Sequence, residues 1–136
     1  SIMKINDNII AKGFIAAGMA NLSVLIWSRF FTNSTIPKFD PVVMSNFGLL
    51  MIVVWGLAYI SVAKKYQYVK WLIAIFVVEK FIYGCAWINW MMHNSLDVVY
   101  SKDIMAGIFY SIYGINDWIF CGFFLYVFVR IRRVKS

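Results

Sequence analysis

Charged residues are scarce in this chain of 136 residues: they make up 14% of it, against about 25% in an ordinary soluble domain. Acidic residues are the scarcer sign, with 6 Asp and Glu against 13 Lys and Arg. Hydrophobic residues reach 62% and the mean hydropathy is +0.75. A soluble helical core needs polar helix faces, which the long apolar stretches here almost lack. The composition therefore excludes an ordinary soluble domain and predicts an integral membrane protein.

Residues that commonly carry metal or nucleophile chemistry are also few. The chain has one histidine, His93, whose nearest acidic residue in sequence is Asp97. One His and one Asp make a poor metal-ligand set, so we predict no metal site. The two cysteines, Cys85 and Cys121, lie in different apolar stretches at different depths, which argues against a disulfide. No P-loop, CxxC pair, HExxH or nucleophile motif is present. The sequence therefore does not identify a cofactor.

The net charge of +7 does not indicate a nucleic-acid partner. Most basic residues stand beside apolar stretches, and no basic patch interleaved with stacking aromatics occurs on a soluble face. We expect the lipid bilayer to be the main partner instead.

Four apolar stretches are each long enough to cross a bilayer, which takes about 20 residues of helix. They predict an all-α integral membrane protein in which four antiparallel transmembrane helices form a single bundle, as one domain over residues 1–136. The predicted spans are residues 9–31, 42–63, 71–92 and 104–129.

Helix-start signals precede three of the spans. Asp7 or Asn8 is a suitable N-cap for the first, and Asp40 followed by Pro41 is typical of the start of the second. Ser101 is the candidate cap of the fourth span.

The distribution of basic residues predicts the topology. The second loop and the C-terminus are rich in Lys and Arg, whereas the first and third loops hold only Lys38 and Lys102. The positive-inside rule therefore places both termini in the cytoplasm. A ridge of small residues over positions 13–20 would let a neighbouring helix approach closely, which we interpret as a sign of a homo-oligomer.

Polar residues interrupt the spans at similar depths. Glu79 and Lys80 lie near the middle of the third span, and Asn116 and Asp117 near the middle of the fourth. Counting helical rise, Asn21 of the first span falls in the same layer, as does Trp55 of the second. Ionisable groups in hydrocarbon are costly, so such a layer suggests a functional site by default.

Aromatic residues accompany this layer. Helical periodicity puts Tyr83 on the face of Glu79, puts Tyr110 and Tyr113 on the face of Asp117, and pairs Trp55 with Tyr59. The site candidates are therefore acidic, basic, amide and aromatic side chains lining one interior: Glu79, Asp117, Lys80, Asn21, Asn116, Trp55, Tyr59, Tyr83, Tyr110 and Tyr113. Trp27, at the outer end of the first span, we interpret as a membrane-interface anchor.

The charges of the layer do not balance, because Lys80 can pair well with only one of Glu79 and Asp117. The other carboxyl must hold a proton, be hydrated or meet a cation from a ligand. The leading hypothesis is thus a small membrane protein that binds or transports a hydrophobic or cationic small molecule, with proton linkage. One alternative is a membrane-embedded acid–base enzyme, such as an isomerase, acting on a lipid-soluble substrate. The other is a structural or accessory subunit whose charges set helix register.

Overall fold

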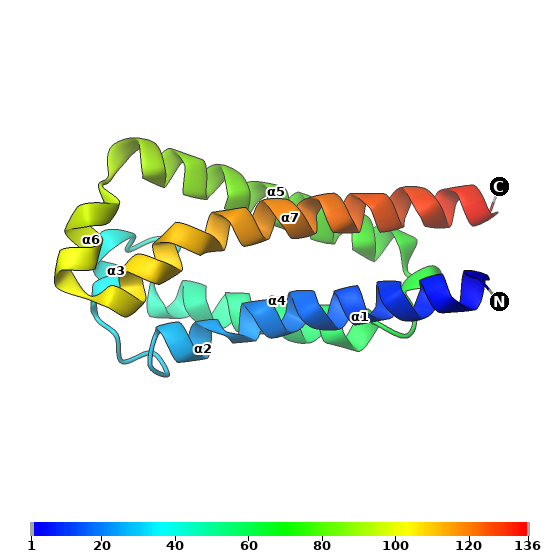
Figure 1. Ribbon diagram of the computed structural model, residues 1–136, viewed down its shortest axis with the longest axis horizontal. Helices are drawn as coiled ribbons and strands as arrows, with labels where there is room; N and C mark the ends of the chain where they lie inside the picture. The colour runs from blue at the N-terminus through cyan, green and yellow to red at the C-terminus, as the bar shows by residue number, and fades with distance from the viewer. Residues whose placement is uncertain (1, 136) are drawn as a thin grey trace.

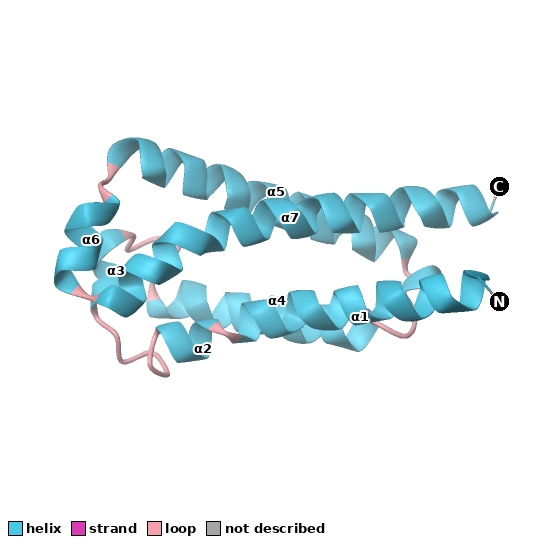
Figure 2. Ribbon diagram, in the orientation of Figure 1, coloured by secondary structure: helices cyan, strands magenta, loops and turns pink. Residues whose placement is uncertain are grey.

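The computed structural model describes the backbone of residues 2–135 and the side chains of residues 7–131. The chain is 83% helix, and no strand occurs over residues 2–135, as Figure 2 shows. The predicted all-α class is confirmed. The elements in chain order are α1 (Ile2–Leu22), α2 (Val24–Trp27), α3 (Thr35–Phe39), α4 (Asn46–Val62), η1 (Tyr66–Tyr68), α5 (Lys70–His93), α6 (Leu96–Lys102) and α7 (Ile104–Lys135).

The longest helices, α1, α4, α5 and α7, run along the long axis of the molecule (Figure 1). The main helix contacts pair α1 with α4 and α5 with α7. The start of α1 and the end of α7 lie at one end, called here the terminal end (Figure 1). The short helices α3 and α6 lie at the opposite end, called here the cap end.

Three helical segments are long and apolar enough to cross a membrane: Asp7–Trp27, Lys70–His93 and Ile104–Ile131. The last two agree closely with the predicted spans 71–92 and 104–129. The fourth apolar helix, α4, has 17 residues and starts four residues later than the predicted span 42–63. At about 1.5 Å per residue, α4 alone is shorter than the ~30 Å hydrocarbon core.

The helix boundaries differ from those of the first predicted span, 9–31, at both ends. Helix α1 begins at Ile2, so Asp7 and Asn8 lie inside the helix and cap nothing. The helical segment ends at Trp27 because Arg29, Phe30 and Phe31 have left-handed φ values of 51°, 56° and 68°. Each such non-glycine residue costs about 1–2 kcal/mol, and the right-handed helix cannot continue through them.

The predicted start of the second span was also wrong. Asp40 accepts a hydrogen bond from the Val43 N–H at 3.1 Å, in a turn that precedes the helix. The N-cap of α4 is Ser45, whose Oγ accepts from the Gly48 N–H at 3.0 Å. Pro41 therefore lies outside the helix that it was expected to open.

The fourth span is capped by Asp103 rather than by Ser101. Asp103 Oδ2 accepts from the Ala106 N–H at 2.9 Å, as an N-cap side chain does. Ser101 belongs to α6, where its hydroxyl donates to the Val98 carbonyl at 2.6 Å. The segment between the third and fourth spans, which looked merely polar in sequence, forms this short helix.

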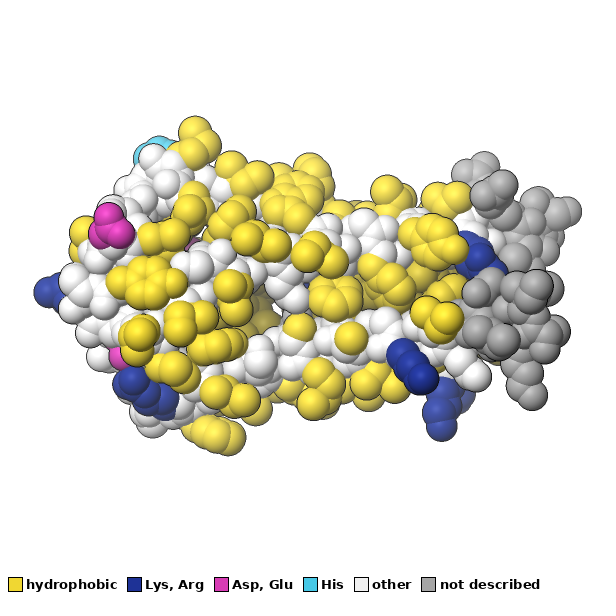
Figure 3. Space-filling view, viewed as in Figure 1, with side chains coloured by type: hydrophobic (Ala, Val, Ile, Leu, Met, Phe, Trp, Pro, Cys, Tyr) yellow, Lys and Arg dark blue, Asp and Glu magenta, His cyan; other side chains and the backbone are white. Residues whose placement is uncertain are grey.

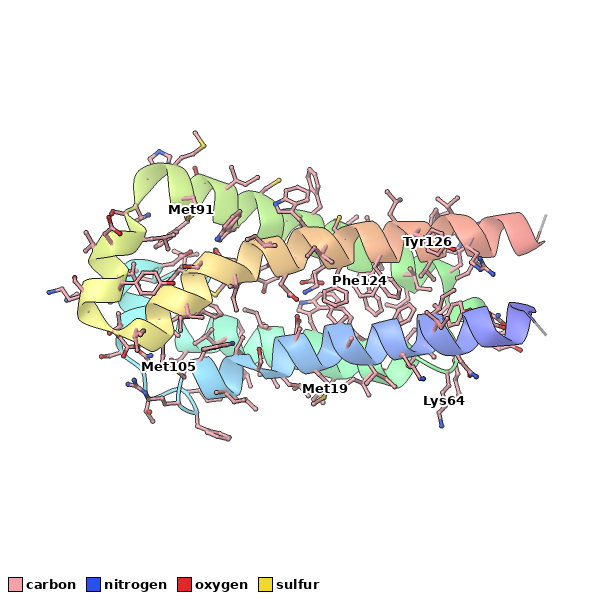
Figure 4. All side chains as sticks on the ribbon, in the orientation of Figure 1. Met19, Lys64, Met91, Met105, Phe124 and Tyr126 are labelled. Carbon is pink, nitrogen blue, oxygen red and sulfur yellow. The ribbon has the colours of Figure 1, made fainter. Side chains whose placement is uncertain are left out.

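The apolar core divides into two clusters along the long axis. Phe14, Tyr59, Phe76 and Phe124 centre the cluster at the terminal end, each fully buried. The cluster at the cap end centres on residues such as Ile36, Leu49, Val99 and Tyr110, also fully buried. In Figure 4, Phe124 points into the interior between α7 and α1.

Glycines bring α1 against α4 between these clusters. A Cβ on Gly56 would lie 2.8 Å from the Asn21 Cβ and 2.9 Å from the Gly18 carbonyl oxygen. The small-residue ridge of the first span is thus used for close packing within the chain. The expected homo-oligomer loses this support and stays a prediction.

Candidate functional site

A buried polar layer lies where the two apolar clusters meet; it consists of Asn21, Lys80 and Asp117. Lys80 Nζ lies 2.9 Å from Asp117 Oδ1 and donates to Asn21 Oδ1 at 2.8 Å. Asn21 in turn donates from its amide to the Ile52 carbonyl at 3.0 Å. Only 1% of the Lys80 surface is exposed. Side chains or backbone of α1, α4, α5 and α7 are therefore joined in one hydrogen-bonded network.

Helical periodicity explains why these polar residues face inward. Each follows a buried residue by four positions on its own helix: Asn21 follows Ala17, Lys80 follows Phe76, and Asp117 follows Tyr113. The apolar stripe of each helix thus carries one polar residue into the centre. Once buried, each must find a partner, since an unpaired charge there costs several kcal/mol.

Glu79 lies beside this layer with a different partner. Its carboxyl oxygen Oε1 accepts a hydrogen bond from the hydroxyl of Tyr59 on α4. Lys80 Nζ lies 5.1 Å from the centroid of the same tyrosine ring, within cation–π range. Within residues 7–131 the carboxyl of Glu79 forms no ion pair. Lys80 therefore pairs with Asp117, and Glu79 is the carboxyl left without a cation.

A cavity of about 140 Å³ opens next to the polar layer. Its volume is similar to the ~150 Å³ of an engineered protein cavity that holds benzene. The wall combines aromatic, aliphatic and polar side chains from α1, α2, α4, α5 and α7. They are Ala20, Asn21, Ser23, Val24, Trp27, Ile52, Glu79, Lys80, Tyr83, Phe109, Ile112, Tyr113, Asn116 and Asp117.

The cavity opens on the side of the molecule, between α1–α2 and α7. Ser23 and Trp27 on one flank and Asn116 on the other are half-buried, and Ile112 is 42% exposed. Figure 3 shows the surface hollowed between the side chains of these helices. The cavity thus opens at the side of the helices and not at either end.

Aromatic packing holds one wall of the cavity in place. Phe109 stacks on Tyr113 with ring centroids 5.2 Å apart, and Tyr110 meets Tyr113 edge-on at 5.9 Å. The hydroxyl of Tyr113 is buried and has no hydrogen-bond partner in the part of the chain that the structure describes. The Tyr113 side chain thus lines the cavity, while its hydroxyl is covered by surrounding atoms.

Most of the predicted site residues gather around this cavity. Those that line it are Glu79, Asp117, Lys80, Asn21, Asn116, Tyr83 and Tyr113. The remaining three lie elsewhere in the interior. Tyr59 lies behind Glu79, and Trp55 packs edge-on against Phe76 at 6.1 Å in the terminal-end cluster. Tyr110 stacks on Trp90 at 4.2 Å and donates its hydroxyl to the Ile36 carbonyl at 2.6 Å.

Sequence reasoning missed several wall residues, chiefly Trp27 and Phe109. Phe109 is four residues from Tyr113, so helical spacing alone places it on the same face. Trp27 was interpreted as an interface anchor, but its indole N–H donates to Ser23 Oγ at 3.2 Å and its ring lines the cavity. Its placement depends on α2 continuing the line of α1, which the sequence pattern does not show.

A second polar cluster closes the cap end beside the cavity. Asp103 pairs with Arg29 at 2.9 Å and accepts from the Asn33 amide at 2.7 Å. Partial burial alone would raise the pKa of Asp103, but the hydrogen bonds from Ala106, Asn33 and Arg29 outweigh it and hold that pKa below its usual value. The cluster thus fastens the left-handed turn after α2 to the start of α7.

The described residues contain no group of three or more His, Cys, Asp or Glu side chains placed to hold a metal ion. Comparison with known proteins finds no matching family model, no similar curated protein and no similar solved structure.

Proposed function

We propose that this chain is a multi-pass membrane protein whose α1–α2, α4, α5 and α7 cross the bilayer as an antiparallel four-helix bundle. Its outer surface supports this, since large apolar side chains such as Phe81, Ile82 and Ile119 are more than half exposed on several helices (Figure 3). Soluble monomers rarely expose such continuous apolar surface. Val42, Val43 and Met44 continue the apolar sequence in the turn that precedes α4.

The proposed orientation places the terminal end in the cytoplasm. Basic residues without nearby acidic partners in sequence flank that end, namely Lys64, Lys65, Lys70 and Arg130. The cap end carries charges of both signs. Its basic residues are Arg29, Lys38 and Lys102, and its acidic residues are Asp40, Asp97 and Asp103. The excess of Lys and Arg at the terminal end is what the positive-inside rule expects of the cytoplasmic side.

The function that we propose is binding of a small hydrophobic or cationic molecule in the lateral cavity. The observation that carries the proposal is a side-opening cavity that joins an aromatic wall to charged groups at mid-span. Trp27, Tyr83, Phe109 and Tyr113 contribute aromatic side chains to the wall, and aromatic rings attract both apolar groups and cations. A lipid-soluble molecule would enter from the bilayer through the opening between α1–α2 and α7.

Glu79 is the group that would link this binding to protons. Since Lys80 pairs with Asp117, an ionised Glu79 leaves the site with one net negative charge. An uncompensated charge in hydrocarbon is expensive, so Glu79 holds either a proton or a cationic ligand nearby. The groups facing it are Tyr59 from α4, Lys80 and Tyr83 from α5, and Asp117 from α7. A proton and a cation would therefore compete for the site.

One observation favours a structural role for part of the layer. The network from Ile52 through Asn21 and Lys80 to Asp117 joins four helices. We therefore assign Lys80 and Asp117 to holding the helices in register, and Glu79 with the cavity wall to ligand binding. The acid–base enzyme hypothesis needs both Glu79 and Asp117 as reacting groups and stays a prediction.

Two probes of matched shape test the proposal: benzyltrimethylammonium, which is permanently charged, and neopentylbenzene, its uncharged counterpart. Binding is measured by calorimetry on protein in lipid nanodiscs from pH 5 to pH 8. We expect the affinity for the cation to rise with pH by up to about tenfold per pH unit where Glu79 titrates, because the proton and the cation compete. The affinity for neopentylbenzene should fall or stay level as the pH rises.

Glu79→Gln removes the titrating carboxyl while keeping the shape of the side chain. It should remove the pH dependence of cation binding while the protein stays folded. The matched control is Asp97→Asn, which removes an exposed carboxyl from α6 and should change neither affinity nor pH dependence. An unchanged pH dependence in Glu79→Gln would exclude Glu79 from this role, and failure of both probes to bind the wild type would refute the proposed function.

A further inference from the structure

The basic residues of the terminal end have no acidic partners in the described part of the chain. Asp7, the acidic residue of that end, accepts hydrogen bonds from the Tyr66 hydroxyl at 2.5 Å and the Gln67 amide at 3.1 Å. Both ion pairs found within residues 7–131 lie elsewhere in the molecule. The cations left unpaired there are Lys64, Lys65, Lys70 and Arg130.

Lys70 differs from the other three cations in its aromatic surroundings. Its Nζ lies 4.9 Å from the centroid of the Trp71 ring and 5.4 Å from that of the Phe128 ring. The two rings meet edge-on with centroids 5.7 Å apart. Both distances from Nζ are within cation–π range. The ammonium group is therefore held between one ring of α5 and one ring of α7; these three residues are called here the Lys70 site.

The ammonium group of Lys70 stays accessible in this position. Lys70 is half-buried, and its Nζ has no oxygen acceptor among residues 7–131. The fully covered side-chain N and O atoms that lack a partner in this part of the chain are the Tyr113 hydroxyl and the Trp118 indole nitrogen, and Lys70 Nζ is not one of them. An ammonium group has three N–H donors, so the Lys70 site can still donate to an anion.

The exposed aromatic residues next to Lys70 are typical of the level of lipid headgroups. Trp71 is 71% exposed, and Tyr68 in η1 is 79% exposed. Trp and Tyr collect at the membrane–water interface. Lys70 is also the first residue of α5, where the helix dipole disfavours a positive charge. The helix itself therefore gains no stability from a lysine at this position.

An exposed apolar stripe leads from the Lys70 site toward mid-span. Ile75 and Val78 follow Trp71 at helical spacing on the same face of α5, and they are 52% and 55% exposed. A molecule with an anionic head at Lys70 and a hydrocarbon tail along this stripe would match both parts of the surface. A phospholipid has this arrangement of charge and hydrocarbon.

We propose that the Lys70 site binds the phosphate of an anionic phospholipid in the cytoplasmic leaflet, at the junction of α5 and α7. This inference concerns a site separate from the cavity and rests on the proposed membrane insertion and orientation. The lipid phosphate accepts hydrogen bonds from the Lys70 ammonium group, and an acyl chain lies along Trp71, Ile75 and Val78. The other unpaired cations of the terminal end favour a lipid of net negative charge over a zwitterionic one.

Dioleoylphosphatidylglycerol and dioleoylphosphatidylcholine test the site, because they share their acyl chains and differ in net charge. Their binding to the detergent-purified protein is measured by native mass spectrometry in 0.15 M ammonium acetate. The wild type should prefer phosphatidylglycerol. Lys70→Gln should reduce that preference about fivefold, the contribution of one lysine near an anionic lipid surface. Its melting temperature should not fall, because the helix dipole disfavours this charge.

Lys65→Gln is the matched control, since it removes the same charge from the same end of the molecule. Lys65 is exposed and lies outside the Lys70 site, so the lipid preference should stay within about twofold of wild type. Phe128→Leu keeps every charge and removes one ring of the site. It should reduce the preference about two- to fivefold, the effect of a cation–π contact at an exposed position.

Three results would overturn the inference. One is equal binding of the two lipids by the wild type. Another is an equal loss of preference in Lys65→Gln and Lys70→Gln, which would show a diffuse effect of net charge. The third is binding of soluble sn-glycerol 3-phosphate as tight as that of phosphatidylglycerol, which would assign the site to a soluble phosphate compound.

Two further measurements separate this inference from the proposed function. Lys70 does not line the cavity, so Lys70→Gln should bind benzyltrimethylammonium as the wild type does. Loss of lipid preference with unchanged benzyltrimethylammonium binding would support two separate sites, whereas loss of both would contradict a local role for Lys70. Extraction of cell membranes with alkaline carbonate tests insertion by itself, and release of the protein into the soluble fraction would refute insertion and this inference together.

Discussion

Lys80 shows how much a single residue contributes to the interior of this molecule. Its side chain is 1% exposed, and its ammonium group is shared between Asp117, Asn21 and the face of the Tyr59 ring. A buried ion pair often adds little net stability compared with apolar residues of the same size, yet removing one partner leaves the other charge uncompensated. The two effects can be separated by mutation.

Asp117→Asn should destabilise the protein by about 3–5 kcal/mol, because it leaves Lys80 buried without a counter-charge. The double variant Lys80→Met/Asp117→Leu should recover most of that loss, since it removes both charges while keeping the volume. Unfolding in detergent micelles, followed by circular dichroism, measures both. A stable single variant or an equally unstable double variant would contradict a register-holding role for the pair.

At the scale of the elements, the turn after α2 is held by contacts from another helix. Three consecutive residues, Arg29, Phe30 and Phe31, have left-handed backbone conformations, which is unusual without glycine. Asp103 links this turn to the first turn of α7 through Arg29 and Asn33. Since α2 carries Trp27 of the cavity wall, the turn also helps to position the mouth of the cavity.

The lowered pKa of Asp103 has a defined consequence for stability against pH. A carboxyl whose pKa is lower in the folded than in the unfolded state stabilises the fold above its unfolded pKa of about 3.9 and loses that contribution as the pH falls through the folded value. Asp103→Ala should cost about 0.5–2 kcal/mol at pH 7, mainly through the lost N-cap of α7. The Arg29 pair adds little, because the Arg29 side chain is 54% exposed.

As the pH falls through the lowered pKa of Asp103, the difference between wild type and Asp103→Ala should shrink, since the wild-type carboxyl becomes protonated. Urea unfolding at pH 7, 4 and 2.5 measures it, and Asp97→Asn is the control for an exposed carboxyl at the same end of the molecule. A difference that stays constant over this range would show that the ionised form of Asp103 has no stabilising role.

For the whole molecule, the proposed orientation separates two groups of exposed lysines. Lys65 lies in the turn that joins α4 to α5, at the terminal end, and Lys102 lies at the end of α6, at the cap end. Both are exposed, so a cysteine in either place would be accessible to reagents on its own side of the membrane.

Single cysteines at positions 65 and 102, in a background of Cys85→Ser and Cys121→Ser, test the orientation. A membrane-impermeant maleimide added to intact cells should label the Lys102→Cys variant, and the Lys65→Cys variant should react only after the membrane is permeabilised. The opposite pattern would invert the proposed topology. Labelling of both variants in intact cells would contradict insertion as a four-span bundle.

The helical class and the positions of the third and fourth long helices could be predicted from sequence because the length and composition of an apolar stretch are local properties. Helical periodicity predicts which residues share a face with Glu79 or Asp117, but the structure alone shows which face is buried, because these helices are apolar on most sides: Ile75 and Ile82, expected on the inner face with Glu79, are exposed. Helix ends were less predictable. Asp40, Pro41 and Ser101 are good start signals in isolation, but Ser45 and Asp103 cap the helices instead, because caps depend on the path of the chain before each helix.

The pairing of Lys80 was beyond the sequence, which left both Glu79 and Asp117 as partners. Which carboxyl it meets depends on how α5 and α7 are rotated about their axes and on α4 bringing Tyr59 to Glu79. The composition of the cavity wall depends on the same helix rotations. Tyr113 lines the cavity, whereas the Tyr110 hydroxyl donates to α3. Sequence alone therefore determined which residues are polar and at what depth along each helix, and tertiary packing decided which of them meet, because rotation and separation of helices are set by contacts between distant parts of the chain.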